Sequence, residues 1–566
     1  MTKLQKLLTF ALLFCFLETA KADTLISNEY ILNIKNEQAL ENLPREFRTS
    51  FIVTSRFQLP NKSFLLTLKT VGEQNSFFQN RIRTLKSLEG FISIEHDEVK
   101  QIINEETANF LEKKWFEHSE LWRYQWAFEN TGDNIPFSDG SIKAGALGED
   151  LKLNEVHSDF PLGKTPIIAI IDSGFKKNHP NLQNILWKNQ KEINGKLGVD
   201  DDQNGFVDDF HGYNFYKNSN DISDGNGHGT RIAGIVGAQL DQGMGVKGLL
   251  KDVEIMPLVF MRENGSGKRS WAIKAIYYAV DNGALVINNS WGSKYYSEAL
   301  VAAIDYAHSK GVLFVTAAGN SSKNNDSLDQ FPANYEVPNV ISVGSLSFRG
   351  GASWFTHFGK NSVDLFAPGQ NILTSNRPNQ YANLFKVVSG TSYAAGFVTA
   401  AAAYLQSREP ELTHLEIKKR MLETVTKKEF LRGFAVSSGT LNLYNFLKGD
   451  KARSLKPDES LWVTQRLKTP IQSNHPYRSY RKKTYDLHIP GAQFLKIRFK
   501  RIDLERGKDF IRLYEGKNRI LVESISGKHS HFESVFFRGD HIQLEFVSDH
   551  AIEEWGFLIE EVKAIF

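Results

Sequence analysis

The sequence predicts an α/β protein whose main part is a parallel sheet covered by helices on both faces. Three observations predict this fold: near-continuous apolar segments follow one another through the middle of the chain, helical patterns separate several of them, and glycines stop those helices. A small α+β part precedes the sheet and an antiparallel β-sandwich follows it. The 566 residues, 41% hydrophobic and 23% charged, suit several globular units and exclude a disordered or collagen-like chain.

The first 22 residues have the pattern of a secretory signal peptide. Two lysines precede an apolar run from Leu7 to Leu17, and small residues suited to a cleavage site end at Ala22. The alternative is a membrane anchor, but the run is shorter than the roughly 20 residues that a spanning helix needs. Cleavage would remove Cys15, the single cysteine. We therefore expect a secreted protein, extracellular or periplasmic, with no disulfide and no membrane span.

Residues 23–118 have the pattern of a small module and a linker. Short alternating segments such as Tyr30 to Ile34 and Ser63 to Leu68 predict strands, and the apolar spacing from Gln74 to Leu88 predicts a helix. Residues 99–120 are polar and acidic, which is typical of a linker. The predicted order is a β-α-β module ahead of the sheet.

Five apolar segments predict the buried strands of the parallel sheet. They are Ile167–Ile171, Val253–Phe260, Ala284–Asn288, Leu313–Ala317 and Val340–Val343. Ser270–Asn282 and Glu298–Lys310 predict intervening helices, each stopped by a glycine. In such a sheet the functional groups collect at the carboxyl ends of the strands. This places Asp172, Asn289 and Asn320 along one edge of the sheet.

Residues 471–566 predict an antiparallel β-sandwich, after a linker at 451–470. The predicted strands are Thr484–Ile489, Phe494–Phe499, Phe510–Tyr514, Ser534–Phe537, Ile542–Phe546 and Phe557–Val562.

The charge balance does not indicate a nucleic-acid partner. The chain has 68 Lys and Arg against 65 Asp and Glu, a formal net charge of +3, and no long run of one sign. A solvated surface explains charges that are spread in this way.

Three segments supply the reagents of covalent acyl transfer in one chain order. Asp172 ends a buried strand, His228 lies in a Gly-Asn-Gly-His-Gly run, and Ser392 lies in a segment rich in glycine and alanine. A serine hydroxyl needs a base to take its proton, histidine is such a base, and a buried carboxylate holds the histidine tautomer. Asn320, alone a turn asparagine, becomes the candidate donor to the oxyanion, together with the backbone N–H of Ser392 at a helix start.

These segments resemble the subtilisin-like serine proteases, the subtilases of peptidase family S8, whose catalytic order is Asp, His, Ser. The resemblance covers about residues 120–445, inside a region 119–450 that we expect to form the catalytic domain. It implies a secreted serine endopeptidase in which Ser392 is the nucleophile and His228 the general base. No cofactor is expected in the chemical step.

The resemblance also implies how the substrate is held. Asp172 would orient the base, and Asn320 would donate to the oxyanion. Ser290-Trp291-Gly292 and Ala318-Gly319 match the segments that pair with the backbone of a protein or peptide substrate as added strands.

The match is imperfect around the nucleophile. The family usually has Met after the serine and Pro at the position of Gly396, whereas this chain has Tyr393 and Gly396. Neither change removes a catalytic group, so these differences affect the rate and not the reaction type. No dense acidic cluster beyond the loop at 200–209 indicates basic substrates, and we expect a broad or apolar-leaning specificity.

The segment from 200 to 209 predicts a calcium site. It places oxygen ligands at alternate positions before a turn glycine, which is the first half of an EF-hand-like spacing, and some secreted subtilases carry a similar calcium-binding loop. The alternative is an ordinary acidic turn, although carboxylates this dense repel one another unless a cation lies among them. The expected ligands are the side chains of Asp200, Asp202, Asn204 and Asp208 and the carbonyl of Phe206.

The N-terminal module resembles the inhibitory propeptides of this family in size, position and β-α-β pattern. The resemblance implies a zymogen whose propeptide is its own inhibitor, cut between about Glu98 and Trp122. A permanent substrate-binding domain is the alternative.

The tail resembles a CUB domain, an extracellular β-sandwich, through segments such as Asp509 to Gly516 and Trp555-Gly556-Phe557. The resemblance implies a ligand on another surface and a second calcium site at Glu505, Asp509 and Asp549, for which solvated loop carboxylates are the alternative. A different class of function also remains open: a catalytically inert secreted binding protein that uses this tail.

Overall fold

The computed structural model describes most of the chain. The described residues are 29–35, 51–60, 62–70, 91–97, 99–102 and 120–566, the last without 154–155, 157–160, 242, 378–383, 453–458, 516–519 and 551. The predicted signal peptide, the predicted helix at 74–88 and most of the linker at 99–120 lie outside them. The chain divides into two compact units: Met1–Val99 with Lys268–Lys274 and Ser297–Ala299, and the remainder.

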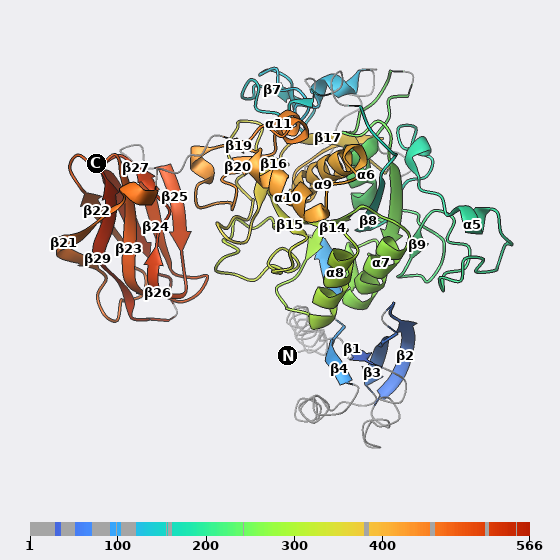
Figure 1. The fold of residues 1–566 in the computed structure, drawn as a ribbon, viewed down its shortest axis with the longest axis horizontal. Helices are drawn as coiled ribbons and strands as arrows, with labels where there is room; N and C mark the ends of the chain where they lie inside the picture. Colours follow the sequence, from blue (N-terminus) through green and yellow to red (C-terminus); the bar gives the residue numbers. More distant parts are fainter. Residues whose placement is uncertain are drawn as a thin grey trace, which may run out of the picture. The chain divides into compact units, whose positions relative to one another are not determined.

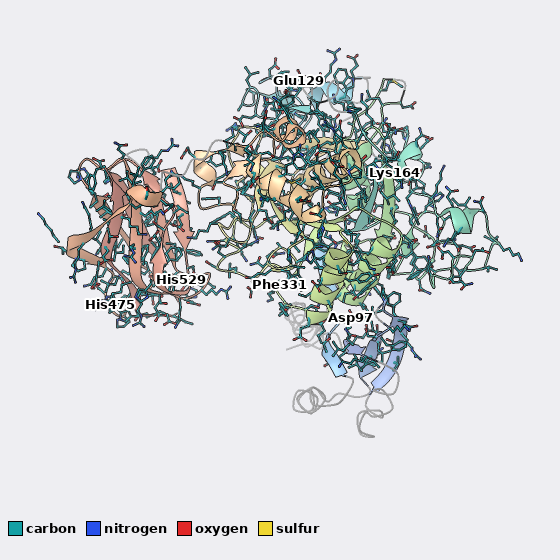
Figure 2. The ribbon with its side chains drawn as sticks, viewed as in Figure 1. Asp97, Glu129, Lys164, Phe331, His475 and His529 are labelled. Atoms are coloured by element: carbon teal, nitrogen blue, oxygen red, sulfur yellow. The ribbon has the colours of Figure 1, made fainter. Side chains whose placement is uncertain are left out.

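The first unit contains a four-stranded antiparallel sheet in the order β2-β3-β1-β4. Its strands are β1 (Glu29–Ile34), β2 (Phe51–Gln58), β3 (Phe64–Thr70) and β4 (Phe91–His96). After β4, the Asp97 carboxylate (labelled in Figure 2) accepts hydrogen bonds from the backbone N and the Oγ of Ser270, 3.0 and 2.6 Å away. Burial raises the pKa of Asp97 above its usual value. A carboxylate in this position caps the start of the helix that contains Ser270.

The second unit is built on a nine-stranded sheet in the order β19-β20-β16-β15-β14-β12-β8-β10-β9 (Figure 1). Neighbouring strands of this sheet pair in parallel, except that the short β19 pairs with β20 in antiparallel orientation. The strands are β8 (Ile167–Asp172), β9 (Tyr213–Asn214), β10 (Glu254–Val259), β12 (Val286–Asn289), β14 (Leu313–Ala317), β15 (Val340–Leu346), β16 (Leu365–Pro368), β19 (Thr426–Lys427) and β20 (Gly439–Thr440). The predicted parallel α/β sheet is confirmed.

Helices cover this sheet. The longest are α6 (His228–Gly237), α7 (Arg269–Asp281), α8 (Glu298–Ser309), α9 (Thr391–Arg408) and α10 (His414–Glu423). The helix α9 is almost wholly buried and packs on β12, β14, β15 and β16, and α6 packs beside it. Small side chains make this close approach possible: a Cβ on Gly396 would meet Ile235 of α6 at 3.3 Å.

Short elements connect these parts. They are η2 (Leu121–Tyr124), β6 (Ile135–Pro136), β7 (Ile142–Lys143), η4 (Gln183–Ile185), α5 (Gln190–Ile193), β11 (Ser266–Lys268), β13 (Trp291–Gly292), β17 (Ile372–Ser375), β18 (Phe385–Val388), η5 (Glu429–Leu431), α11 (Leu443–Lys448) and η6 (Glu459–Leu461). No helix among the described residues is long and apolar enough to cross a membrane.

The tail forms two antiparallel sheets around an apolar core. One sheet has the order β21-β29-β23-β26, with β27 beside β23, and the other has the order β22-β28-β24-β25. The strands are β21 (Val463–Gln472), β22 (Lys482–His488), β23 (Phe494–Asp503), β24 (Phe510–Glu515), β25 (Ile520–Ile525), β26 (Lys528–Glu533), β27 (Phe537–Arg538), β28 (His541–Val547) and β29 (Gly556–Ile565). The predicted antiparallel sandwich is confirmed.

The structure differs from the sequence prediction at particular strands. The strand β21 lies largely inside the expected linker at 451–470 and pairs with β29. Its side chains are mostly exposed, and Pro470 suits an edge strand, so no apolar alternation marks it. The strands β25 and β26 were not predicted, and residues 534–536 lie outside a strand.

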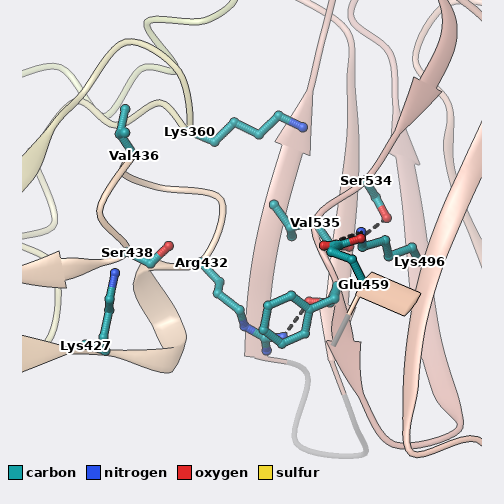
Figure 3. Close-up of a pocket in the computed structure, with 10 residues that line it drawn as sticks. Lys360, Lys427, Arg432, Val436, Ser438, Glu459, Lys496, Ser534 and Val535 are labelled. Atoms are coloured by element: carbon teal, nitrogen blue, oxygen red, sulfur yellow. Dashed lines mark hydrogen bonds and ion pairs between the residues drawn. The ribbon is translucent and has the colours of Figure 1, made fainter. Parts of the chain in front are cut away.

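The tail contacts the α/β part through paired charges. The buried Arg432, after η5, pairs with Glu515, and Lys360 donates to Glu523 of β25 over 2.6 Å. Asn324 donates from Nδ2 to the backbone O of Ser524, 2.7 Å away. A pocket of about 270 Å³, lined by residues of both parts, lies at this contact (Figure 3).

Candidate active site

Asp172 and His228 meet at the carboxyl end of the parallel sheet. Asp172 ends β8, and His228 begins α6 after Gly227, whose φ of +102° suits glycine. The Nδ1 of His228 lies 2.8 Å from both carboxylate oxygens of Asp172, and both side chains are buried. This geometry fixes the tautomer: Nδ1–H donates to the carboxylate, which leaves Nε2 as the basic atom.

A second carboxylate, not anticipated from the sequence, holds the start of α6. Asp224 accepts hydrogen bonds from the backbone N of Gly227 and from the N and Oγ1 of Thr230, at 2.6 to 2.9 Å. It also accepts from Ser173 Oγ, and Ser173 Oγ accepts from the backbone N of Gly229. The sequence does carry a signal, because a carboxylate in the segment that leads into a helix is favoured near the helix N-terminus.

Ser392 lies in the first turn of α9, buried, with Oγ 3.5 Å from the backbone O of Ser290. Asn320, three residues beyond β14, contacts the same helix start: its Oδ1 accepts from the backbone N and the Oγ1 of Thr391, both at 2.9 Å. Because the amide oxygen is used by Thr391, the amide Nδ2 is the atom that can donate to an oxyanion. The structure thus brings Asn320 to the start of the helix that carries Ser392.

Two buried residues, absent from the sequence prediction, support the segment before Asn320. Asn325 donates from Nδ2 to the backbone O of Ala318 over 2.9 Å, and its Oδ1 accepts from His357 Nδ1 over 2.8 Å. His357 packs on Gly319, where an added Cβ would lie 2.3 Å from Nδ1 and where φ is +128°. Burial lowers the pKa of His357 from 6.5 to about 4, so the ring is neutral. Asn325 and His357 are called the brace below.

The substrate segments expected from the sequence are partly strands. Trp291 and Gly292 form β13, and Trp291 is buried with its Nε1 donating to the backbone O of Ile171. Beyond β13, Ser293 pairs with Phe331, which Figure 2 labels. Ala318 and Gly319 follow β14 without strand structure.

The strand β5 (Val99–Ile102) lies between β11 and β13. Ile102 is paired with Trp291 and Gln101 with Gly292 in antiparallel orientation. A segment of this chain therefore pairs with the strand at which the sequence predicted substrate pairing.

The acidic loop brings together a set of carboxylates that only partly overlaps with the predicted one. Oxygens of Glu192, Asp202 and Asp209 lie within 4.8 Å of one another, and Glu192 and Asp209 are buried. Burial raises the pKa of Asp209 to about 6, although Tyr278 and Asn204 donate to it. Three carboxylates suit a hard divalent cation such as Ca²⁺, which would offset their mutual repulsion.

Two other predicted ligands of the loop, Asp208 and Asp200, lie outside this cluster and accept hydrogen bonds from backbone groups. Both carboxylate oxygens of Asp208 accept from the backbone N of Gly198, at 2.9 and 3.0 Å. Asp200 accepts from the backbone N of Asn204 and of Gly205. The ring of Phe206 packs among aromatic side chains, which does not bear on its carbonyl, the predicted ligand atom. Glu192 precedes the loop by eight residues, which is why the alternating pattern did not indicate it.

In the tail, Asp509 and Asp549 are joined by a hydrogen bond from the backbone N of Asp549 to Oδ1 of Asp509, 2.8 Å long. Asp509 also accepts from the Tyr477 hydroxyl, and Glu505 accepts from the backbone N of Ile552. These three described carboxylates are not close enough to one another to form a group like the one in the acidic loop.

Comparisons with known proteins relate this chain to one family. A profile of the subtilase family matches residues 163–441. The major intracellular serine protease of Bacillus subtilis is 35% identical over 264 residues, which cover 46% of this chain and 74% of that relative. Subtilisin-like protease 1 of Plasmodium vivax is 33% identical over 277 residues, 46% of this chain and 43% of the relative. The match thus spans less than half the length of this relative.

Among solved structures, fervidolysin from Fervidobacterium pennivorans, described as a keratinolytic enzyme related to subtilisin, aligns over 89% of this chain and 84% of its own. The TM-score is 0.56 and the sequence identity 18%, so this similarity shows the fold.

Proposed function

Because this chain belongs to the subtilase family, we propose that it is a serine endopeptidase that hydrolyses peptide bonds through an acyl-enzyme on Ser392. The hydrogen bond between His228 Nδ1 and Asp172 carries the proposal. It leaves Nε2 of His228 to accept the proton of the Ser392 hydroxyl and then to return it to the leaving amine. Asp172 stabilises the imidazolium that forms between these two steps.

The oxyanion of the tetrahedral intermediate would be held by two donors. They are the backbone N–H of Ser392, at the positive end of α9, and Nδ2 of Asn320, whose orientation is fixed by the bonds of its Oδ1 to Thr391. The substrate backbone would add a strand beside β13, with Ala318 and Gly319 opposite. Proteins or peptides are therefore the proposed substrates.

The N-terminal part is proposed as an inhibitory propeptide. The pairing of Gln101 and Ile102 with β13 supports this role, because β5 then occupies the edge that a substrate strand would use. Cleavage between about Glu98 and Trp122 would separate it from the catalytic part. Self-processing is the proposed route, since the bond to be cut follows β5 in the same chain.

Three further properties are proposed. Export rests on the pattern of the first 22 residues and places the enzyme outside the cytoplasm. A structural Ca²⁺ in the acidic loop rests on the three clustered carboxylates. The tail, which resembles a CUB domain, would recognise a ligand on another surface.

A Ser392→Ala variant tests the central proposal. The wild type should cleave a peptide library and react stoichiometrically with a fluorophosphonate at Ser392, and the variant should do neither and should retain its N-terminal part. Loss of the nucleophile in such enzymes costs about 10⁶ in kcat, so residual cleavage should be undetectable. A wild type that does not react with the fluorophosphonate would favour the inert binding protein instead.

A further inference from the structure

The residue after the nucleophile lies between the two catalytic helices. Tyr393 is in the first turn of α9, is 0% exposed, and has its ring centroid 5.8 Å from that of His228 at an angle of 49°. Subtilases usually carry a methionine at this position. A phenol differs from a thioether because its oxygen is a strong hydrogen-bond acceptor in a rigid position.

The hydroxyl of Tyr393 accepts a hydrogen bond from a buried guanidinium. Arg231 lies one turn after His228 in α6, is 5% exposed, and donates from Nε to the Tyr393 hydroxyl over 3.1 Å. Its Nη1 donates to Oδ1 of Asn376, 3.2 Å away, after β17. Gly227 leaves room for this group, since an added Cβ would lie 2.8 Å from Nη1.

The same arginine is also held through its backbone. The carbonyl O of Arg231 accepts from Oγ1 of Thr374 in β17, at 2.9 Å. The Arg231 side chain and backbone therefore connect α6 to α9 and to the segment around the end of β17.

These bonds are directional, whereas the packing of Gly396 against α6 is apolar. Gly396 of α9 packs on Ile232 and Ile235 of α6, which gives close approach without fixing rotation. A guanidinium donates along fixed directions, and a buried one is costly to leave unbonded. Rotation of α9 relative to α6 would therefore strain the bond from Arg231 to Tyr393.

We propose that Tyr393, acting through Arg231, is a positioning residue that sets the orientation of the Ser392 hydroxyl relative to Nε2 of His228. The proposal rests on the proposed function, because it concerns the geometry of proton transfer between these two groups. Misplacement of reacting groups by about 1 Å can cost on the order of 100-fold in rate. Loss of the single hydrogen bond between Arg231 and Tyr393 should also lower the rate, but by less than this.

Tyr393→Phe tests this role, because it removes one oxygen atom and keeps the ring. We expect kcat to fall roughly tenfold with KM within twofold of the wild type, and fluorophosphonate labelling of Ser392 to slow by the same factor. The matched control is Tyr404→Phe, a buried tyrosine of α9 three turns further on, which should leave both rates unchanged.

A double-mutant cycle tests the route through Arg231. If Tyr393 acts through the Arg231 side chain, Arg231→Met should lower kcat at least as much as Tyr393→Phe does. The double variant should then have the same kcat as Arg231→Met alone. Additive losses, a loss confined to KM, or a Tyr393→Phe variant with wild-type kcat would overturn the proposal. If Arg231→Met does not fold, the kcat and labelling rate of Tyr393→Phe decide alone. Failure of the wild type to react with the fluorophosphonate would instead contradict the proposed function.

Discussion

The proposed catalytic side chains come from four distant segments, and neighbouring groups hold them in place. Asp172 accepts from the backbone N of Ser173, and His228 begins a helix whose start is held by hydrogen bonds to Asp224. Asn320 is held by Thr391, which is itself adjacent to Ser392. The proposed reactive groups therefore depend on residues that hold them in place: Ser173 for Asp172, Asp224 for the helix of His228, and Thr391 for Asn320.

Asn320→Ala should lower kcat by about 10²–10³ with little change in KM, because its amide would donate to the oxyanion and not to the bound substrate. The measurement is steady-state cleavage of a peptide substrate. Asn361→Ala, the same change at an exposed position, is the control and should retain wild-type kcat. An equal loss in both variants would contradict the role of Asn320.

The candidate reactive groups could be selected from the sequence because each carries a local pattern: a carboxylate at a strand end, a histidine among glycines, a serine before small helical residues. The brace could not be predicted, since Asn325 and His357 are 32 residues apart and neither stands in a pattern that indicates a partner. Glu192 was missed for a similar reason. Among strands, buried apolar runs such as β14 were predicted correctly, and exposed polar ones such as β21 and β26 were not.

The neutral His357 of the brace predicts a pH effect on stability. The pKa of His357 is about 4 in the folded chain and 6.5 in the unfolded chain. Above pH 6.5 the ring is neutral in both states and the folded chain has its full stability. As the pH falls from 6.5 toward 4, only the unfolded chain binds the proton, so the free energy of unfolding decreases. A shift of this size corresponds to roughly 3 kcal/mol. His357→Gln removes this titrating group. Between pH 7 and pH 4, its unfolding free energy, measured with urea, should decrease less than that of the wild type, and the two decreases should differ by about 3 kcal/mol. If the unfolding free energies of the variant and the wild type decrease equally over this pH range, the predicted effect of His357 is wrong.

The acidic loop predicts a dependence on calcium. Chelation should lower the melting temperature of the wild type, because an ion that binds only the folded state at 100 times its Kd adds about 2.7 kcal/mol. Glu192→Gln, which changes a clustered carboxylate, should abolish the response to chelator. Asp208→Asn is the control: its carboxylate is not part of the cluster of Glu192, Asp202 and Asp209, so the response should persist. A melting temperature that does not respond to chelator in the wild type would exclude the ion.

At the scale of the whole molecule, the tail contacts segments next to the brace. Asn324, which donates to Ser524 of the tail, is adjacent to Asn325, and Lys360, which donates to Glu523, lies three residues from His357. The tail therefore supports the two segments that supply the brace.

Lys360→Met should destabilise the protein by roughly 3 kcal/mol, because Glu523 is 2% exposed and would be left as a buried charge without its partner. Replacing both residues, as Lys360→Met with Glu523→Gln, should recover most of this loss. Urea unfolding measures both variants. If the single and the double variants are equally unstable, the charge of Glu523 is not the cause.

The tyrosine next to Ser392, the proposed nucleophile, also has a consequence for redox chemistry. Methionine is converted to its sulfoxide by peroxides, and a thioether next to Ser392 would be a target. Here that position holds Tyr393, and of the described methionines Met256, Met261 and Met421 are buried while Met244, 47% exposed, lies in a turn. Treatment with hydrogen peroxide should oxidise Met244 first, as mass spectrometry would show, and leave peptide cleavage intact. Such an enzyme would keep working where oxidants accumulate.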